Sequence, residues 1–149
     1  MASIFDVAQY ILECTGPITT LKLQKLVYYS QAWHLVWEEN PLFDDRIEAW
    51  ANGPVAPSLY SKHQGMFKID AASLGLGDSS NLAPNEKESI DEIVSFYANK
   101  TAEYLVLLTH AEAPWKEARK RAQAHPGERC TEEITLADML EYYSGLLDE

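Results

Sequence analysis

The spacing of apolar side chains along the chain predicts a protein built mainly of helices. Apolar residues recur at helical intervals after Ser3, and Ser3 with Asp6 forms the pattern of a capping box. Gly16 and Pro17 should end this first helix, because glycine tolerates positive φ and proline has no backbone donor. Capping residues and prolines predict that further helices begin near Thr19, Pro57, Pro84, Thr101, Pro114 and Thr135.

The second predicted helix, from Thr19 or Thr20 to about Glu39, is apolar nearly all the way round. Residues such as Leu23, Val27 and Trp33 leave few of its positions for solvent. This pattern is typical of a helix that packs on several sides. At 1.5 Å per residue the helix would be about 30 Å long, and we expect it to be the axis of the fold.

Two stretches depart from the helical pattern. Within residues 41 to 57, the run from Arg46 to Trp50 alternates polar with apolar, and Asn52, Gly53 and Pro54 then break it. This pattern predicts a small two-stranded β element. Residues 70 to 83 are rich in Gly, Ser and Asn and are expected to form a mobile loop. Between these two stretches, the helix that begins at Pro57 should run toward Phe67.

The predicted fold class is therefore mainly α: a compact single-domain helical bundle over residues 1 to 149, with a long central helix and a small two-stranded β element. A chain of 149 residues with 46% hydrophobic residues has enough apolar side chains for one core.

The formal charge of −11 changes the list of plausible partners. Such a field repels phosphate backbones, which makes nucleic acid a poor candidate, and it favours encounter with a basic protein. Without a basic leader or an apolar run near the ~18 residues of a membrane span, the protein is expected in the cytoplasm with no membrane partner. Cys14 and Cys130 lack zinc-ligand spacing and are expected to be reduced thiols.

Common catalytic motifs do not occur in the sequence. None of the four histidines lies in a His-Glu-x-x-His pattern, and neither a nucleophile elbow nor a phosphate-binding loop is present. We therefore predict no catalytic residue, no metal and no cofactor. His110, near Trp115, is expected to be structural, although a small enzyme that uses His110 with a distant acid remains an alternative.

Two groups of residues are candidates for binding a partner. Lys22, Lys25 and Tyr29 share one side of the central helix, with Gln24 and Tyr28 nearby, and form either a solvated stripe or a polar groove. The second group combines a large aromatic residue with a rigid turn, which suits either a structural role or an interface; it comprises Trp50, Gly53 and Pro54.

A basic cluster at Lys116, Arg119, Lys120 and Arg121 should lie on one helix. It could remain solvated, pair with the acidic last segment or hold an acidic patch of a partner. A regulator that reads DNA through this cluster is a further alternative, which the net acidity disfavours.

Three blocks of sequence, in order, resemble the Panacea domain, the antitoxin domain of bacterial and phage toxin–antitoxin pairs related to the SocA-type antitoxins. The first is the run from Leu21 to Ala32, and the second is Ile47-Glu48-Ala49-Trp50 followed by Gly53-Pro54-Val55. The third is Thr109-His110 with Pro114-Trp115. Asn52 departs from the aromatic residue that many relatives carry, and residues 71 to 83 have no clear counterpart in the family.

The resemblance implies an antitoxin whose partner is a cognate toxin encoded by a neighbouring gene, in a bacterium or a prophage. Direct binding would neutralise the toxin, and delivery of the toxin to a protease is the alternative. The expected partner-binding residues are Lys22, Gln24, Lys25, Tyr28, Tyr29, Trp50, Gly53, Pro54, His110 and Trp115.

Overall fold

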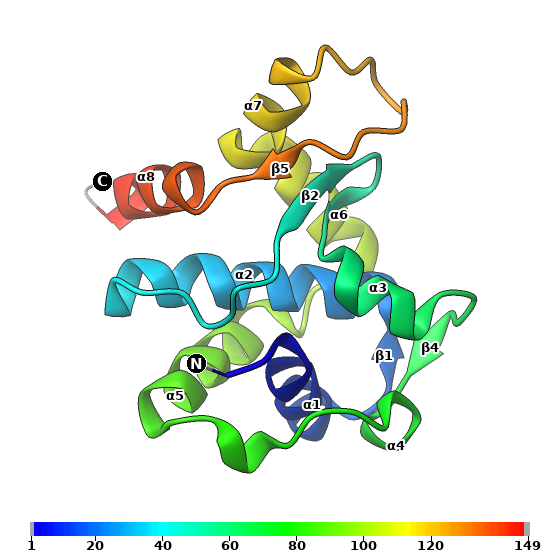
Figure 1. Cartoon of the computed structure of the whole chain (residues 1–149), viewed down its shortest axis with the longest axis vertical. Helices are drawn as coiled ribbons and strands as arrows, with labels where there is room; N and C mark the ends of the chain where they lie inside the picture. Colours follow the sequence, from blue (N-terminus) through cyan, green and yellow to red (C-terminus); the bar gives the residue numbers. More distant parts are fainter. Residues whose placement is uncertain (1, 148–149) are drawn as a thin grey trace.

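A long central helix organises the computed structural model, which describes residues 2–147. This helix, α2 (Thr20–Glu38), lies between α8 (Leu136–Leu147) on one side and α1 (Ile4–Thr15) with α5 (Pro84–Tyr97) on the other (Figure 1). α6 (Ala102–Ala111) also packs against it. Leu23, Leu26 and Val27 are fully buried, and burial all around α2 confirms the predicted axis of the fold.

The predicted capping box holds the start of α1. The amide of Ser3 donates to Asp6 Oδ2 at 3.0 Å, and the amide of Asp6 donates to Ser3 Oγ at 3.2 Å. Asp6 also accepts from the amide of Asp78 at 2.8 Å. One buried carboxylate therefore caps α1 and ties a distant segment to it, and its hydrogen bonds lower the pKa of Asp6 against the opposing effect of burial.

The segment predicted as a mobile loop, residues 70 to 83, instead carries two short helices. These are α4 (Ala71–Leu74) and the 3-10 helix η1 (Ser79–Asn81). Leu74 and Leu82 are buried, and a Cβ built at Gly77 would lie 2.2 Å from the carbonyl oxygen of Phe5. The prediction was wrong because a few leucines and one glycine dock the segment on α1 despite its polar composition.

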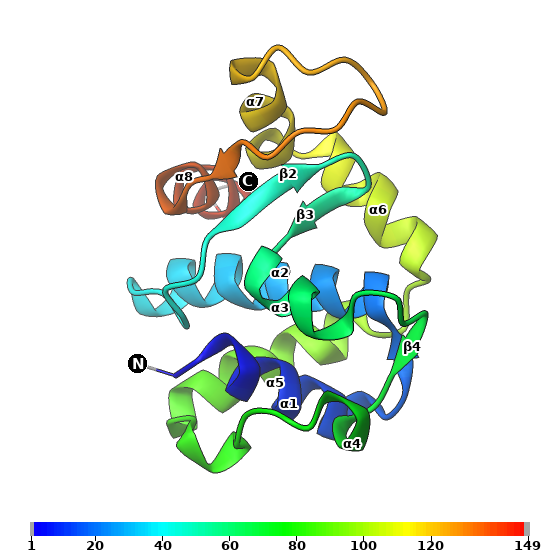
Figure 2. The same ribbon diagram turned by 45° about the vertical axis from the view of Figure 1, so that its right-hand side comes forward.

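A hairpin crosses one side of α2 (Figure 2). Its strands β2 (Ile47–Trp50) and β3 (Gly53–Val55) pair antiparallel, which confirms the predicted two-stranded element. A third strand, β5 (Glu133–Ile134), joins the other edge of β2 to give the order β3-β2-β5. A separate pair joins β1 (Ile18–Thr19) to β4 (Lys68–Ile69).

Prolines open α3 (Pro57–His63) and α7 (Ala113–Arg121) in the first turn, as expected. α3 ends at His63, before the predicted limit at Phe67.

Arg121 of the basic cluster lies 2.9 Å from Asp138 of α8, so the predicted pairing with the last segment is confirmed for this residue. Cys14 and Cys130 are free thiols, as expected. Within residues 2–147, no helix has the length and apolar content needed to cross a membrane.

Candidate functional site

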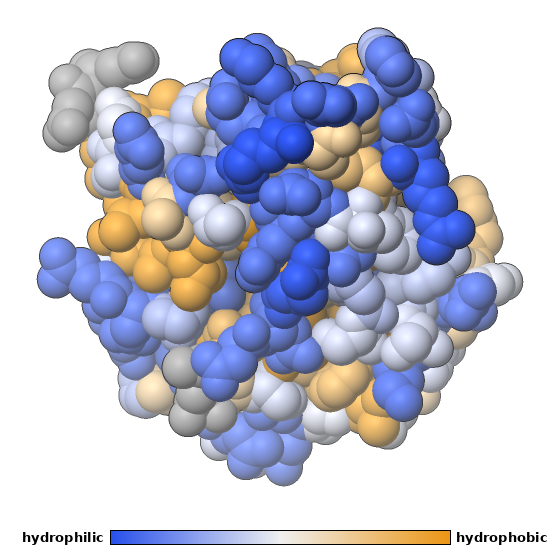
Figure 3. Space-filling model, turned by 45° about the horizontal axis from the view of Figure 1, so that its top comes forward, coloured by the Kyte–Doolittle hydropathy of each residue, from blue (hydrophilic) through white to orange (hydrophobic). Residues whose placement is uncertain are grey.

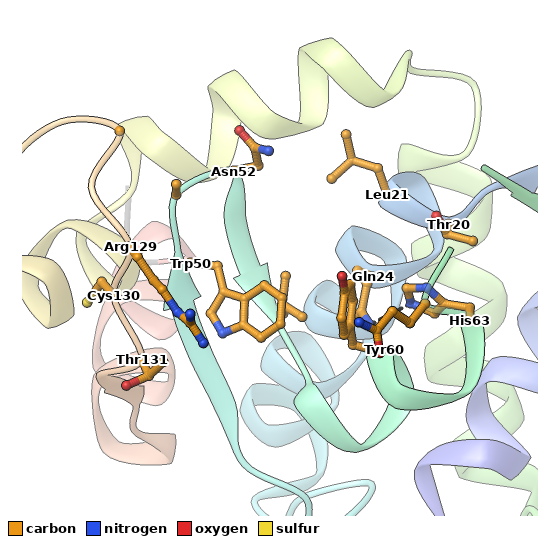
Figure 4. Close-up of a pocket in the computed structure, with 14 residues that line it drawn as sticks. Thr20, Leu21, Gln24, Trp50, Asn52, Tyr60, His63, Arg129, Cys130 and Thr131 are labelled. Atoms are coloured by element: carbon orange, nitrogen blue, oxygen red, sulfur yellow. Dashed lines mark hydrogen bonds between the residues drawn. The ribbon is translucent and has the colours of Figure 1, made fainter. Parts of the chain in front are cut away.

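A cleft of about 610 Å³ opens in front of the β2–β3 turn. The hairpin, the start of α2, α3 and the connection from α7 to β5 surround it (Figure 4). Its lining residues are Thr20, Leu21, Gln24, Trp50, Ala51, Asn52, Val55, Tyr60, His63, Gln64, Gly127, Arg129, Cys130 and Thr131.

Two aromatic rings occupy the centre of the cleft. The ring centroids of Trp50 and Tyr60 are 4.8 Å apart in an edge-to-face arrangement. Trp50 also donates from Nε1 to Glu48 Oε1 at 2.8 Å, which fixes the indole on the hairpin. Figure 4 shows Arg129 reaching from the opposite wall toward Trp50. The cleft thus combines a fixed apolar surface with a cation.

Gln24 of α2 holds the base of the hairpin from inside the protein. Its side-chain oxygen accepts from the amide of Ala56 at 2.9 Å, and its Nε2 donates to the carbonyl of the same residue at 3.4 Å. Nε2 also lies 2.9 Å from Nε2 of His63, whose pKa is lowered by burial. One amide side chain therefore positions both the hairpin and α3.

Lys25 supports the turn itself. It has no exposed surface, and its Nζ donates to the carbonyl of Pro54 at 3.1 Å. Burial lowers the pKa of Lys25 to about 7. Gly53 has φ of +112°, and a Cβ there would lie only 2.7 Å from Lys25 Cε and 2.9 Å from Thr109 Oγ1. The glycine is required by both its conformation and the close approach of the lysine.

A stack of three side chains braces the other side of the hairpin. The rings of His110 and Trp115 are 3.9 Å apart and nearly parallel, and the Arg119 guanidinium lies 5.1 Å from the Trp115 ring centroid. Trp115 donates from Nε1 to the carbonyl of Trp50 at 2.8 Å. Burial, and then the charges of Lys25 and Arg119, lower the pKa of His110.

Arg119 joins the two walls of the cleft. Its guanidinium donates to the carbonyls of Ala49 at 3.0 Å, His125 at 2.9 Å and Glu128 at 2.7 Å. Only 5% of this residue is exposed, so Arg119 is not part of a solvated basic cluster, which was one of the alternatives that the sequence left open. The basic residue was visible in the sequence, but its carbonyl partners lie in β2 and in the connection from α7 to β5, and no local pattern identifies them.

The structure brings together seven of the ten predicted site residues at the hairpin, but mainly as its support. Trp50 and Gln24 line the cleft, whereas Lys25, Gly53, Pro54, His110 and Trp115 lie behind its walls. The other three lie elsewhere: Lys22 donates to the carbonyl of Ala98 near the end of α5, and Tyr28 and Tyr29 are buried.

Tyr28 and Tyr29 belong to an internal network centred on Glu112. Its Oε1 accepts from Tyr29 at 2.7 Å and from Tyr143 of α8 at 2.8 Å, and the hydroxyls of Tyr28 and Tyr143 are 3.0 Å apart. Burial raises the pKa of Glu112, against the effect of the two donated hydrogen bonds. The polar groove expected on α2 around Lys25 and Tyr29 is therefore absent, because both side chains are enclosed.

Sequence reasoning missed Tyr60, Gln64 and Arg129 as cleft residues. They lie on α3, after it and in a loop, and they share no periodicity or motif. In residues 2–147 the structure groups no three His, Cys, Asp or Glu side chains in a way that could hold a metal ion.

The fold defines a mainly helical protein with a cleft whose walls are held by buried side chains, and the sequence comparisons define its family. The family described as "Antitoxin SocA-like, Panacea domain" matches residues 23–116, and the chain belongs to this family. The match includes the hairpin and the His110–Trp115 stack and ends before Arg119.

A curated relative, Antitoxin SocA of Caulobacter vibrioides (strain NA1000 / CB15N), is 31% identical over 110 residues. The aligned region covers 66% of this chain and 58% of the relative, so this chain spans a little more than half of that protein's length. No solved structure gives a significant match.

Proposed function

We propose that this protein is an antitoxin that neutralises a cognate toxin in the cytoplasm by direct, non-covalent binding at the cleft in front of the hairpin. Membership in the SocA-like antitoxin family supports the antitoxin role. The observation that carries the choice of site is the convergence of Gln24, Lys25, Trp115 and Arg119 on the backbone around one turn.

A turn held in this way is suited to docking. Because its backbone is fixed before the partner arrives, little conformational entropy is lost on binding. Trp50 presents a partly exposed aromatic surface beside it, and tryptophan is enriched among residues that dominate interface energies. The charge of −11 favours encounter with a toxin that is basic overall.

The position of His110 favours binding over catalysis. Its ring is stacked on Trp115 behind the hairpin and is not among the groups that line the cleft. A general base must reach the proton that it abstracts, and His110 is separated from a ligand in the cleft by the hairpin itself. The alternative of a His110-dependent enzyme therefore has no geometric support.

Co-expression with the product of the adjacent gene tests the proposal. We expect that the chain relieves growth arrest and co-purifies with that product. Thr131→Trp should fill the cleft and abolish both effects, whereas Ser95→Trp, a matched change at an exposed position on α5, should abolish neither.

Persistent arrest without a complex would contradict the antitoxin role. Full rescue by Thr131→Trp would leave that role intact and contradict the cleft as its site. The half-life of the toxin distinguishes masking from delivery to a protease: masking predicts an unchanged half-life, and delivery predicts a shorter one.

A further inference from the structure

We propose that the cleft recognises an acidic side chain, Asp or Glu, in an extended segment of the toxin. Arg129 pairs with the carboxylate, and the Trp50–Tyr60 pair contacts the neighbouring apolar residue. This inference rests on the proposed function and specifies the chemistry of the bound segment.

Arg129 is the first observation. In the part of the chain that the structure describes, it is the only arginine whose guanidinium makes neither an ion pair nor a hydrogen bond. Arg46 pairs with Glu48 at 3.0 Å, Arg119 donates to three carbonyls, and Arg121 pairs with Glu132 and Asp138. A free guanidinium at the edge of a cleft offers two parallel donors that match a carboxylate.

The local charge is the second observation. The chain has 23 acidic residues, yet none of those within residues 2–147 lines the cleft. The nearest acidic group on the hairpin, Glu48, is already engaged by Arg46 and by the indole of Trp50. Figure 3, in which the α7 end of the molecule is turned forward, shows hydrophilic residues over much of that end. An acidic segment therefore meets a local cation in a protein whose overall charge would repel it.

The third observation is that Arg129 is held at the cleft by a braced loop. Arg119 binds the carbonyls of His125 and Glu128, and Arg46 donates to the carbonyl of Thr131 at 3.1 Å. The amide of Ala49 donates to the carbonyl of Glu132 at 2.9 Å. The backbone on both sides of Arg129 is thus fixed to the rest of the protein, which reduces the entropy lost when Arg129 binds a ligand.

The cleft also offers free polar side chains in place of a sheet edge. Among residues 2–147, the side-chain amides of Asn52 and Gln64 make no hydrogen bond, so they can bind the backbone of an extended segment. Strand addition at β3 is blocked, because Lys25 occupies the carbonyl of Pro54 and Gln24 occupies both backbone groups of Ala56. Recognition by side chains is the mode that remains on this side of the hairpin.

The test uses overlapping short peptides that tile the product of the adjacent gene, incubated with the full chain. We expect the bound peptides to contain Asp or Glu and to bind about tenfold more weakly to Arg129→Glu. Lys120→Glu makes the same change of charge on the exposed side of α7, outside the cleft, and should alter the affinity less than about twofold. Replacing the peptide's acidic residue with lysine should restore binding to Arg129→Glu.

Two results would overturn this inference while leaving the proposed function intact. One is a toxin complex and growth rescue that Arg129→Glu does not weaken. The other is binding that depends on the terminal carboxyl of the peptide, seen as loss on amidation with no effect of Asp→Asn or Glu→Gln. Absence of any complex between the toxin and the wild-type chain would instead contradict the proposed function.

Discussion

Two buried polar clusters share the central helix, and they differ in how their charges are compensated. In the tyrosine cluster, the carboxylate of Glu112 accepts hydrogen bonds from Tyr29 and Tyr143, which also meets Tyr28. In the hairpin support, the Lys25 amine makes one hydrogen bond within the described residues, and its acceptor is the neutral carbonyl of Pro54. In residues 2–147 no carboxylate lies within 4.0 Å of this amine.

The comparison separates residues that hold the fold from residues that hold the site. Neither charge has an ion-pair partner within residues 2–147, so hydrogen bonds alone replace the hydration that each loses on burial. Glu112 accepts two such bonds whereas Lys25 makes one, so the burial of Lys25 is less well compensated and costs stability. What Lys25 does is fix a turn whose front face lines the cleft, together with Gly53 and the stacked Trp115. We infer that the protein tolerates the destabilising burial of Lys25 because this residue preserves the shape of the cleft.

The largest effect is expected from Glu112→Ala, which breaks the tyrosine cluster. The change leaves the hydroxyls of Tyr29 and Tyr143 buried without their acceptor, and each such group is costly. We expect the free energy of unfolding, measured by urea denaturation, to fall by roughly 3 kcal/mol. Glu117→Ala, at an exposed position on α7, should change it by less than about 0.5 kcal/mol. Equal effects would show that Glu112 contributes nothing as an acceptor.

The second prediction concerns the pH dependence that Lys25 introduces. Because its pKa is about 7 in the folded protein and 10.5 ordinarily, the unfolded chain binds more protons between these values. Stability from this residue therefore rises with pH across that window. Lys25→Met removes this pH-dependent contribution. The free energy of unfolding of the variant minus that of wild type should therefore fall by roughly 2 kcal/mol between about pH 7 and about pH 9.

Measuring both proteins at each pH cancels the contributions of other groups, such as Cys14, whose pKa is raised mainly by burial. A difference between wild type and Lys25→Met that stays constant with pH would mean that Lys25 keeps its ordinary pKa inside the protein. In that case the contrast between the two clusters would be lost.

The same contrast explains what the sequence could predict. Local signals placed most of the helices, because caps, prolines and apolar spacing act over a few residues; Thr19, for example, accepts from the amide of Lys22 at the start of α2. The order of the three sequence blocks also pointed to the correct family and to the hairpin. These features are encoded within or next to the elements that they define.

The sequence could not distinguish a residue that lines the cleft from one that supports its walls. Lys25 and Tyr29 have the spacing of an exposed stripe, and their burial follows from the packing of α6, α8 and β3 against α2. Arg129 has no periodicity to mark it, since its place at the cleft depends on the neighbouring loop carbonyls of His125 and Glu128, which bind Arg119 of α7. Strand β5 has two residues, too few for an alternating pattern.

Gly53→Ala tests how tightly Lys25 and the turn fit together. Gly53 and Gly127 both have positive φ, but only Gly53 has atoms within 4 Å of the position that a Cβ would occupy. We expect Gly53→Ala to lower the free energy of unfolding by about 2 kcal/mol, and Gly127→Ala by about 1 kcal/mol from backbone strain alone. Similar losses for the two variants would indicate that the approach of Lys25 to the turn adds no constraint.

The smallest effect is expected from Trp115→Phe, which keeps an aromatic ring beside His110 but removes the donor to the carbonyl of Trp50. Loss of one partly buried hydrogen bond should lower the free energy of unfolding by about 1 kcal/mol. The more informative signal is the Nε1–H resonance of Trp50, which reports its bond to Glu48. We expect this resonance to shift in Trp115→Phe and to stay unchanged in Trp37→Phe, on the exposed end of α2. If the Trp50 resonance shifts in Trp115→Phe without a large loss of stability, the stack behind the hairpin sets the geometry of the cleft more than it stabilises the fold. If the resonance does not shift, Trp50 keeps its position without Trp115.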